Sequence, residues 1–343
     1  MAGRFDPLTR AAVRGGRTDV PAGRAATGAA TGAATGAATA SGAKERRWTP
    51  DGPVDLGLVL GPLRRGPGDP TFRTTPDGSV WRTGRSPEGL AATLRVFGTG
   101  PEVTAEAWGP GADWFLEQLP ALLGAGDDPA AFVPRHRLVH ASHRRRPGLR
   151  LTRTGLVLES LIPTVLEQKV TADEAYRAWR RLVRQYGEPA PGPGPELYVL
   201  PEARTWAMIP SWDWHKAGVD AKRSATIVRA ARVANRLEEA AAMDLPEAVR
   251  RLEAVPGIGP WTSAETLQRS NGDPDAITTG DLHLPGIIGY ALAGDRDADD
   301  AAMLELLAPY AGQRHRAARL VLLAGRTPPR RAPRMPRSDI GRF

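Results

Sequence analysis

The stretch VPGIGPWTS, residues 255–263, constrains the fold of this 343-residue chain more than any other feature. Two glycines stand two residues apart, between segments in which apolar residues recur at helical spacing. Glycine permits the backbone conformations that a tight turn requires, and prolines lie on either side of the turn. The pattern therefore predicts two helices joined by a short hairpin turn, over residues 252–269.

A hairpin of this kind is suited to holding a nucleic-acid backbone. Bare backbone at Gly257 and Gly259 lets N–H groups approach a phosphate, and the second helix adds the positive end of its dipole. The amide of Trp261 and the hydroxyl of Thr262 are further candidate donors. Such contacts position a protein on DNA without reading its sequence. A plain glycine-rich turn is the alternative, but the complete string LEAVPGIGPWTS favours DNA binding.

A lone carboxylate, Asp281, follows Gly259 by 22 residues in the stretch AITTGDLHLP. Taken alone, it would be interpreted as a helix cap. Its distance from the hairpin favours a second role, as an anion beside a nucleotide rotated out of the duplex. Cleavage of an N-glycosidic bond builds positive charge on the sugar, and a fixed carboxylate stabilises that charge and orients or deprotonates water. We therefore expect Asp281 to be the catalytic residue.

Composition excludes several classes of site. The chain has no cysteine, which rules out disulfides, thiolate zinc sites and cysteine-bound iron–sulfur clusters. We expect neither a metal nor a cofactor. The sequence has no apolar run of about eighteen residues or more and no secretory signal. These features predict a monomer of the cytoplasm, associated with the nucleoid and not with a membrane.

The net charge of +8 is unevenly distributed. Residues 1–47 and residues 326–343 each carry +5, which leaves −2 for the body between them. The excess positive charge therefore belongs to the two ends and is weak support for DNA binding. One internal segment is an exception, because residues 135–153 contain seven arginines, three histidines and no acid.

The chain is long enough for two domains, and its composition divides it into four parts. Residues 24–43 repeat AATG without bulky apolar side chains, and we therefore expect residues 1–46 to be a disordered basic arm. Residues 47–145 contain short runs in which apolar and polar residues alternate, and this pattern predicts a small α+β domain with an antiparallel sheet. Residues 146–325 have helical spacing and predict an all-α domain. Residues 326–343 are rich in proline and arginine, which predicts a second disordered segment.

Local motifs place individual elements within these parts. VDLGLVL, from Val54, alternates as in a strand, and FRTTPDGSVWR predicts a hairpin turning at residues 77–78. TADE, residues 171–174, is a capping box that opens a helix ending at Gly187. Residues 221–237 predict one continuous amphipathic helix.

Two segments resemble a known family. The hairpin and aspartate together, VPGIGPWTSAETLQRSNGDPDAITTGDLHL, resemble the signature of the helix-hairpin-helix (HhH-GPD) DNA glycosylase superfamily. RPGLRLTRTGLVLESLIPTVLEQKVT is similar to the start of the helical domain in its AlkA-like branch, the DNA-3-methyladenine glycosylase II family. The resemblance covers about residues 50–325. It implies an α+β fold, in which a small TBP-like antiparallel-sheet domain precedes an all-α helix-hairpin-helix domain.

The resemblance also implies an activity. It points to a DNA glycosylase of base excision repair that flips out and hydrolyses alkylated purines of the 3-methyladenine type from double-stranded DNA. Asp281 would be the catalytic carboxylate, and Gly257 and Gly259 the phosphate contacts. Members that also nick the strand have a lysine at the position of Trp261, which forms a Schiff base with the sugar. Tryptophan cannot do so, which implies a monofunctional enzyme without lyase activity.

Aromatic residues are candidates for the base pocket. The indoles of Trp212, Trp214 and Trp261 would attract a cationic methylated purine, although core packing explains them equally well. Trp206 is expected in the core. The family tends to have an aromatic pocket residue near the last helix, and His315 is closest to that place. A surface position is the alternative for His315.

One further departure from the family concerns the residue that fills the gap left by the flipped base. AlkA-like proteins insert an apolar wedge there, whereas this chain has EQKV, with Gln168 and Lys169 at the tip. These two residues are our candidates for the wedge. Two other functions stay open from the sequence: a non-catalytic helix-hairpin-helix DNA-binding protein, and a glycosylase for oxidised or deaminated bases.

Overall fold

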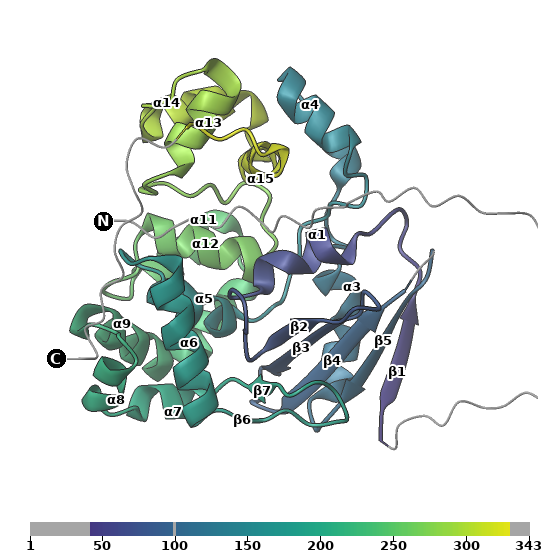
Figure 1. Ribbon diagram of the computed structural model, residues 1–343, viewed down its shortest axis with the longest axis vertical. Helices are drawn as coiled ribbons and strands as arrows, with labels where there is room; N and C mark the ends of the chain where they lie inside the picture. Colours follow the sequence, from purple (N-terminus) through teal and green to yellow (C-terminus); the bar gives the residue numbers. More distant parts are fainter. Residues whose placement is uncertain (1–41, 99–100, 330–343) are drawn as a thin grey trace, which may run out of the picture.

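The computed structural model describes residues 42–98 and 101–329 (Figure 1). Its N-terminal part contains a five-stranded sheet in the order β1-β5-β4-β3-β2, with every neighbouring pair antiparallel. The strands are β1 (Lys44–Trp48), β2 (Phe72–Thr74), β3 (Val80–Arg85), β4 (Ala91–Phe97) and β5 (Val103–Trp108). The helices α2 (Ala112–Glu117) and α3 (Leu119–Leu122) pack their apolar side chains with those of the sheet in one core. The expected sheet and its α+β class are confirmed.

The hairpin between β2 and β3 turns where the sequence predicted. Gly78 has a φ of 81°, which glycine adopts without strain, and Thr74 pairs with Val80 across the turn. Asp77 accepts hydrogen bonds from the hydroxyl groups of Thr75 and Ser79, which fixes the turn locally. The register of the two strands therefore follows from turn chemistry.

Two expectations for the N-terminal part are wrong. VDLGLVL is not a strand but the helix α1 (Leu56–Leu60), because Asp55 caps it by accepting a hydrogen bond from the amide of Leu58. Residues 44–46, which we expected in the disordered arm, begin the edge strand β1, and Lys44 forms an ion pair with Asp113 of α2. The remainder of the arm up to residue 41, like residues 330–343 of the C-terminal segment, lies outside the described residues.

The rest of the described chain is mostly helical. Thr171 and Glu174 form the predicted capping box, and the helix that they open stops before Gly187. The predicted helix over residues 221–237 is broken at Val233. The helices are α4 (Arg137–Arg144), α5 (Val157–Leu166), α6 (Ala172–Tyr186), α7 (Ala203–Met208), α8 (Ser211–Lys216), α9 (Ala221–Arg232), α10 (Ala234–Glu238), α11 (Leu245–Glu253), α12 (Pro260–Ser270), α13 (Leu284–Ala293), α14 (Asp300–Leu307) and α15 (Arg314–Ala324).

Shorter elements connect these helices. The 3₁₀ segments are η1 (Gly61–Leu63), η2 (Pro129–Ala131), η3 (Glu239–Ala242) and η4 (Ala308–Tyr310). The strands β6 (Glu188–Pro189) and β7 (Tyr198–Val199) form a minimal hairpin in the region that we expected to be entirely helical. This hairpin packs on the large sheet, since Leu197 joins Trp81 and Trp108 in a small apolar cluster. No helix in the described part of the chain is long and apolar enough to cross a membrane.

The helices form two packed groups, each with its own core (Figure 1). One surrounds the buried helix α5 and includes α6, α9 and α12, and the other joins α13, α14 and α15. The basic helix α4 belongs to the second group, because Ser142 donates a hydrogen bond to the carbonyl of Leu320 at 2.7 Å. Residues 137–144 thus pack with the C-terminal helices, although the proposed domain boundary assigns them to the N-terminal domain.

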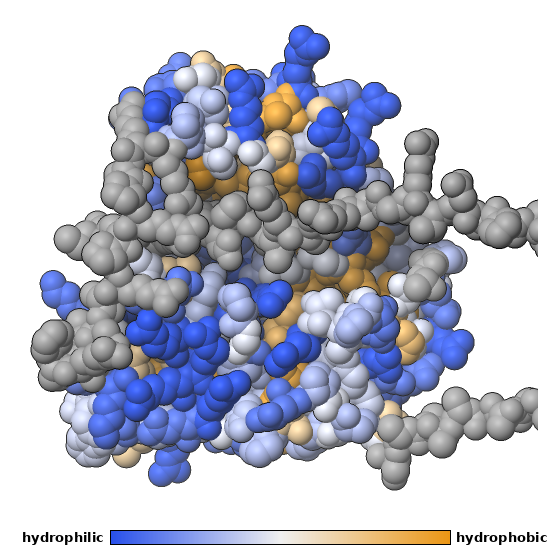
Figure 2. Space-filling model, in the orientation of Figure 1, coloured by the Kyte–Doolittle hydropathy of each residue, from blue (hydrophilic) through white to orange (hydrophobic). Residues whose placement is uncertain are grey.

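The hydropathy of the surface differs between regions of the molecule. Figure 2 shows hydrophilic side chains over α6 and hydrophobic surface over α1 and close to α15. The helices α1 and α15 come from opposite ends of the described chain, yet Arg319 of α15 donates a hydrogen bond to the carbonyl of Leu58 in α1. The N-terminal part and the last helix therefore meet directly, and the cavity described next lies where they meet.

Candidate active site

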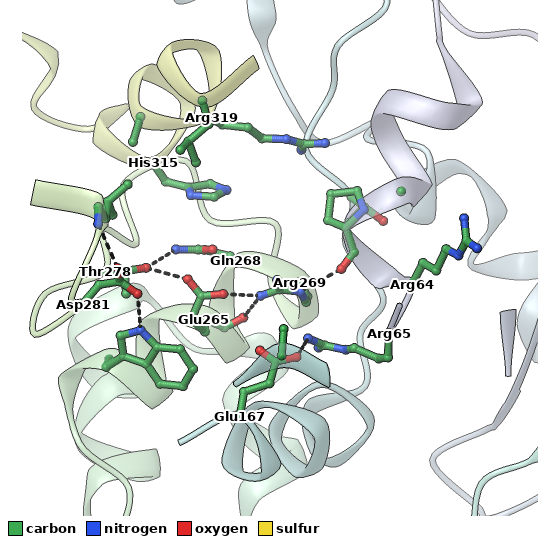
Figure 3. Close-up of a pocket in the computed structure, with 18 of the residues that line it drawn as sticks. Arg64, Arg65, Glu167, Glu265, Gln268, Arg269, Thr278, Asp281, His315 and Arg319 are labelled. Atoms are coloured by element: carbon green, nitrogen blue, oxygen red, sulfur yellow. Dashed lines mark hydrogen bonds and ion pairs between the residues drawn. The ribbon is translucent and has the colours of Figure 1, made fainter. Parts of the chain in front are cut away.

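A cavity of about 250 Å³ lies between four segments that are distant in sequence (Figure 3). Residues 61–67, which follow α1, form one side, and α15 forms another. The helix α12 and the loop after it, residues 277–284, form a third side, and the α5–α6 region completes the wall. Three of the predicted site residues line this cavity: Trp261, Asp281 and His315.

Asp281 is held rigidly at the cavity wall. Its Oδ1 accepts hydrogen bonds from the amides of His283 and Leu284, at 2.7 and 2.8 Å. Its Oδ2 accepts a hydrogen bond from Trp261 Nε1 at 3.0 Å. Because α13 begins at Leu284, the carboxylate both caps this helix and faces the cavity. The two interpretations of Asp281 are therefore compatible with each other, since one oxygen serves the cap while the other lies beside the indole.

A buried polar network supports the loop that carries Asp281. Gln268 donates hydrogen bonds to the carbonyl of Ala276 and to Thr278 Oγ1, both at 2.8 Å. Thr278 in turn donates to Glu265 Oε1 at 2.8 Å, and Arg269 pairs with the other oxygen of Glu265 at 2.8 Å. None of these residues was predicted from the sequence, although the polar residues on the buried helix α12 could have indicated Glu265, Gln268 and Arg269.

A second buried ion pair lies next to the first, as Figure 3 shows. Arg65 donates to Glu167 Oε1 at 3.1 Å, across 102 positions of sequence. Burial raises the pKa of the Glu167 carboxyl, although Arg65 and Arg269 oppose this shift. This pair could not be predicted from the sequence, because its two members are 102 positions apart.

The two glycines of the hairpin are required for different reasons. Gly257 has a φ of 101°, and a Cβ there would lie 2.0 Å from Thr226 Oγ1 of α9, so both conformation and packing demand glycine. Gly259 has an ordinary extended conformation, and a Cβ there would meet nothing within 4 Å. The helix α12 begins directly after Gly259 without a side-chain cap. Bare backbone at position 259 thus leaves the N-terminus of α12 open to a ligand.

Two residues near the hairpin do not lie as we expected. The Thr262 side chain is buried, and its Oγ1 accepts a hydrogen bond from Gln168 Nε2 at 2.8 Å, so the hydroxyl does not face the open end of α12. The same Gln168 nitrogen donates to the carbonyl of Gly257 at 3.0 Å. Gln168 therefore fastens the hairpin to the end of α5 and does not project as a wedge. Lys169 is exposed, with a left-handed backbone conformation (φ 55°).

The expected wall of tryptophans is wrong for two of its three members. Trp214 is 3% exposed and stacks on Trp206 with ring centroids 6.0 Å apart, while its Nε1 donates to the carbonyl of Ile209. Trp212 is 62% exposed and does not line the cavity. Their segment folds as α8, which packs into the core around α9, away from the cavity. Trp206 is in the core as predicted, and Trp261 alone of the three lines the cavity.

The α15 side of the cavity is positively charged. His315 faces the cavity and is not a surface residue. Burial lowers the pKa of its imidazole well below the usual value, and the positive charges of Arg319, Arg269 and Arg316 lower it further. Its imidazole is therefore neutral at pH 7. Arg319 stands one helical turn further on and is 5% exposed. Burial and the neighbouring arginines lower its pKa to about 9, so that it still carries a charge at neutral pH.

About half of this chain is similar in sequence to curated proteins whose names describe DNA repair enzymes. No family model matches the chain. A Mycobacterium tuberculosis protein named probable bifunctional transcriptional activator/DNA repair enzyme AlkA is 32% identical over 170 residues, which are 49% of this chain and 32% of that protein. The DNA-3-methyladenine glycosylase of Bacillus subtilis is 26% identical over 171 residues, which are 49% of this chain and 56% of the relative. The matches thus span only part of each relative.

Structural comparison covers more of the chain. The 3-methyladenine DNA glycosylase of Archaeoglobus fulgidus aligns with a TM-score of 0.65 at 20% identity, over 81% of this chain and 97% of that one. The 8-oxoguanine glycosylase/lyase of Clostridium acetobutylicum, in complex with double-stranded DNA, aligns with a TM-score of 0.64 at 14% identity, over 80% and 92%. The chain therefore has the fold of these two DNA glycosylases, and the relatives found by sequence comparison bear out its resemblance to AlkA-like proteins.

Proposed function

We propose that this protein is a monofunctional DNA glycosylase that excises alkylated purines of the 3-methyladenine type from double-stranded DNA. One observation carries the proposal: the Asp281 carboxylate is fixed by three N–H donors at the wall of a cavity, beside the indole that follows the hairpin turn. The name of the Bacillus subtilis relative supports the substrate class, and the name of the Mycobacterium tuberculosis relative supports a role in DNA repair.

The geometry supports separate roles for the hairpin, which would bind the DNA backbone, and for the cavity, which would hold the damaged nucleotide. The open N-terminus of α12 at Gly259 would bind a backbone phosphate, which fixes the strand and leaves the damaged nucleotide free to rotate into the cavity. Asp281 and the hairpin are tied together by the Trp261 hydrogen bond. Phosphate contact and carboxylate therefore keep a constant separation.

The reaction follows from the charge that develops on the sugar. As the bond between C1′ and the base nitrogen breaks, the bonding pair leaves with the base and the deoxyribose becomes cationic. The Asp281 carboxylate stabilises that cation and accepts the proton of the attacking water, whose oxygen bonds to C1′. Since no lysine lines the cavity in the described residues, and Trp261 occupies the position next to Asp281, water is the nucleophile that we propose.

The most direct test is Asp281→Asn. The amide keeps the size of the side chain but removes its negative charge, so single-turnover release of methylated purine from alkylated duplex DNA should fall on the order of 100-fold or more. Binding to DNA that contains an abasic site should remain. Asp128→Asn is the matched control, because Asp128 is an exposed helix-capping aspartate and asparagine caps equally well.

The test also separates the competing functions. If Asp281→Asn were as fast as the parent, the proposed mechanism would be wrong. A parent protein that binds DNA but releases no base would instead be a non-catalytic helix-hairpin-helix protein. Chromatographic identification of the free bases released from DNA with mixed lesions would reveal a preference for oxidised or deaminated bases.

A further inference from the structure

The arginines of the basic segment, residues 135–153, do not line the cavity, although the segment holds seven of them and no acid. Three of the seven stabilise the fold. Arg146 and Arg153 donate hydrogen bonds to main-chain carbonyls of other segments, and Arg150 pairs with Asp51. The other four are exposed: Arg135, Arg137, Arg144 and Arg145.

These four exposed arginines have no compensating charge. None of their guanidinium groups has an ion pair or a hydrogen bond within residues 42–98 and 101–329. Arg144 and Arg145 lie at the C-terminal end of α4, where a cation suits the helix dipole. Arg135 and Arg137 lie at the opposite end, where a cation opposes the dipole. Stabilisation of α4 therefore does not explain the set, which favours an anionic ligand outside the described fold.

The helix α4 separates its packing residues from its charged residues. Val139 and Ser142 are buried, and Ser142 donates its hydrogen bond to α15. Arg137, His140 and Arg144 follow one another at three and four positions, so they share the opposite, exposed face of the helix. Figure 2 shows hydrophilic side chains over α4. This face therefore offers a row of cations to solvent.

The basic face of α4 lies one helix away from the cavity. Residues 318 and 319 of α15 line the cavity, and the carbonyls of Leu320 and Leu323 accept hydrogen bonds from α4. The axes of packed helices are about 8–10 Å apart, so the exposed face of α4 is roughly 20 Å from the cavity once the helix widths are added. Base pairs follow one another every ~3.4 Å, which makes this distance about six base pairs.

We infer that the exposed face of α4 binds the phosphate backbone of the duplex about six base pairs from the nucleotide in the cavity. The inference rests on the DNA-binding part of the proposed function and adds a second contact surface to the hairpin. Guanidinium groups suit this role, because they bind phosphate oxygens through paired hydrogen bonds. An acidic protein is the other ligand with suitable charge, but none of the exposed large apolar side chains of the described residues lies in α4 to form the centre of a protein interface.

The first experiment removes two of these charges together, in the double variant Arg137→Gln/Arg144→Gln. Affinity is measured for a duplex with an abasic site, so that no excision intervenes. The slope of log Kd against the logarithm of salt concentration should fall by about 1.8, because each lost phosphate contact removes about 0.9. Between about 50 and 200 mM salt, the parent should therefore lose about tenfold more affinity than the variant.

Two asymmetric duplexes locate the contact. The abasic site lies about four base pairs from one end in the first duplex and about four from the other end in the second, so that one arm is always too short to reach α4. The parent and the double variant should therefore differ on only one of the two duplexes.

The matched control removes the same amount of charge elsewhere. Arg73 of β2 and Arg204 of α7 are also exposed and have no carboxylate partner among the described residues. Arg73→Gln/Arg204→Gln should leave the salt slope close to that of the parent. Both double variants change exposed side chains, so thermal unfolding should be unaltered.

A reduced slope on one duplex, confined to the α4 variant, supports the inference. The same reduction in the control, or on both duplexes, would mean that only net charge matters and would overturn it. An unchanged slope would also overturn it, and would leave an acidic protein as the ligand that suits this face. Release of methylated purine by the same preparations tests the proposed function separately. A parent that shows the α4 effect but releases no base would overturn that function and leave the second contact surface standing.

Discussion

Two tryptophan-containing stretches, residues 209–218 and residues 255–263, look equally suited to a binding site in the sequence but differ in the structure. In the first, the indole N–H of Trp214 donates to the main-chain carbonyl of Ile209, and the ring is buried against Trp206. In the second, the indole N–H of Trp261 donates a hydrogen bond to Asp281, which lies in another segment, and Trp261 lines the cavity. The partner of the indole nitrogen, and not the density of tryptophans, distinguishes a core residue from a site residue.

The largest effect that would sharpen this comparison concerns stability. Trp214→Ala removes a fully packed indole, so the free energy of unfolding should fall by about 3–5 kcal/mol in a denaturant titration. The matched Trp212→Ala variant removes an exposed indole of the same helix and should change stability by no more than about 0.5 kcal/mol. Loss of base excision in Trp212→Ala, with the fold intact, would show that this stretch belongs to the site after all.

The next effect concerns the rate of excision. Trp261→Phe keeps an aromatic ring but removes one of the three donors to Asp281. A hydrogen bond to a charged group is worth about 1.5–3 kcal/mol, so the single-turnover rate should fall roughly 10- to 100-fold with little change in stability. A rate equal to that of the parent would mean that the indole is a packing residue, like Trp214.

The smallest effect concerns the two glycines of the hairpin. Gly259→Ala places a Cβ in open space, so the fold should be unchanged while DNA affinity falls severalfold, because the methyl group obstructs a phosphate at the α12 N-terminus. Gly257→Ala should instead lower the melting temperature, since its Cβ collides with Thr226 and its φ is positive. Binding titrations at several salt concentrations and thermal unfolding measure the two effects. Equal DNA affinity in the parent and in Gly259→Ala would argue against a phosphate contact at this glycine.

Local chemistry made several elements predictable. The capping box at Thr171, the turn at Gly78 and the helix-hairpin-helix around Gly257 each depend on residues within a few positions of one another. The expectation of a strand at VDLGLVL failed because one hydrogen bond from the amide of Leu58 to Asp55 favours a short helix over the alternating pattern.

The sequence by itself determined the hairpin, the position of a carboxylate after it and the succession of a sheet and a helical region. Only the tertiary structure decided which side chains share the cavity, because its walls come from segments that are far apart in the chain. Arg65 meets Glu167 across 102 positions, and Arg319 meets Leu58 across 261. Contacts at such separations depend on how whole helices pack, and a local pattern of residues contains no information about them.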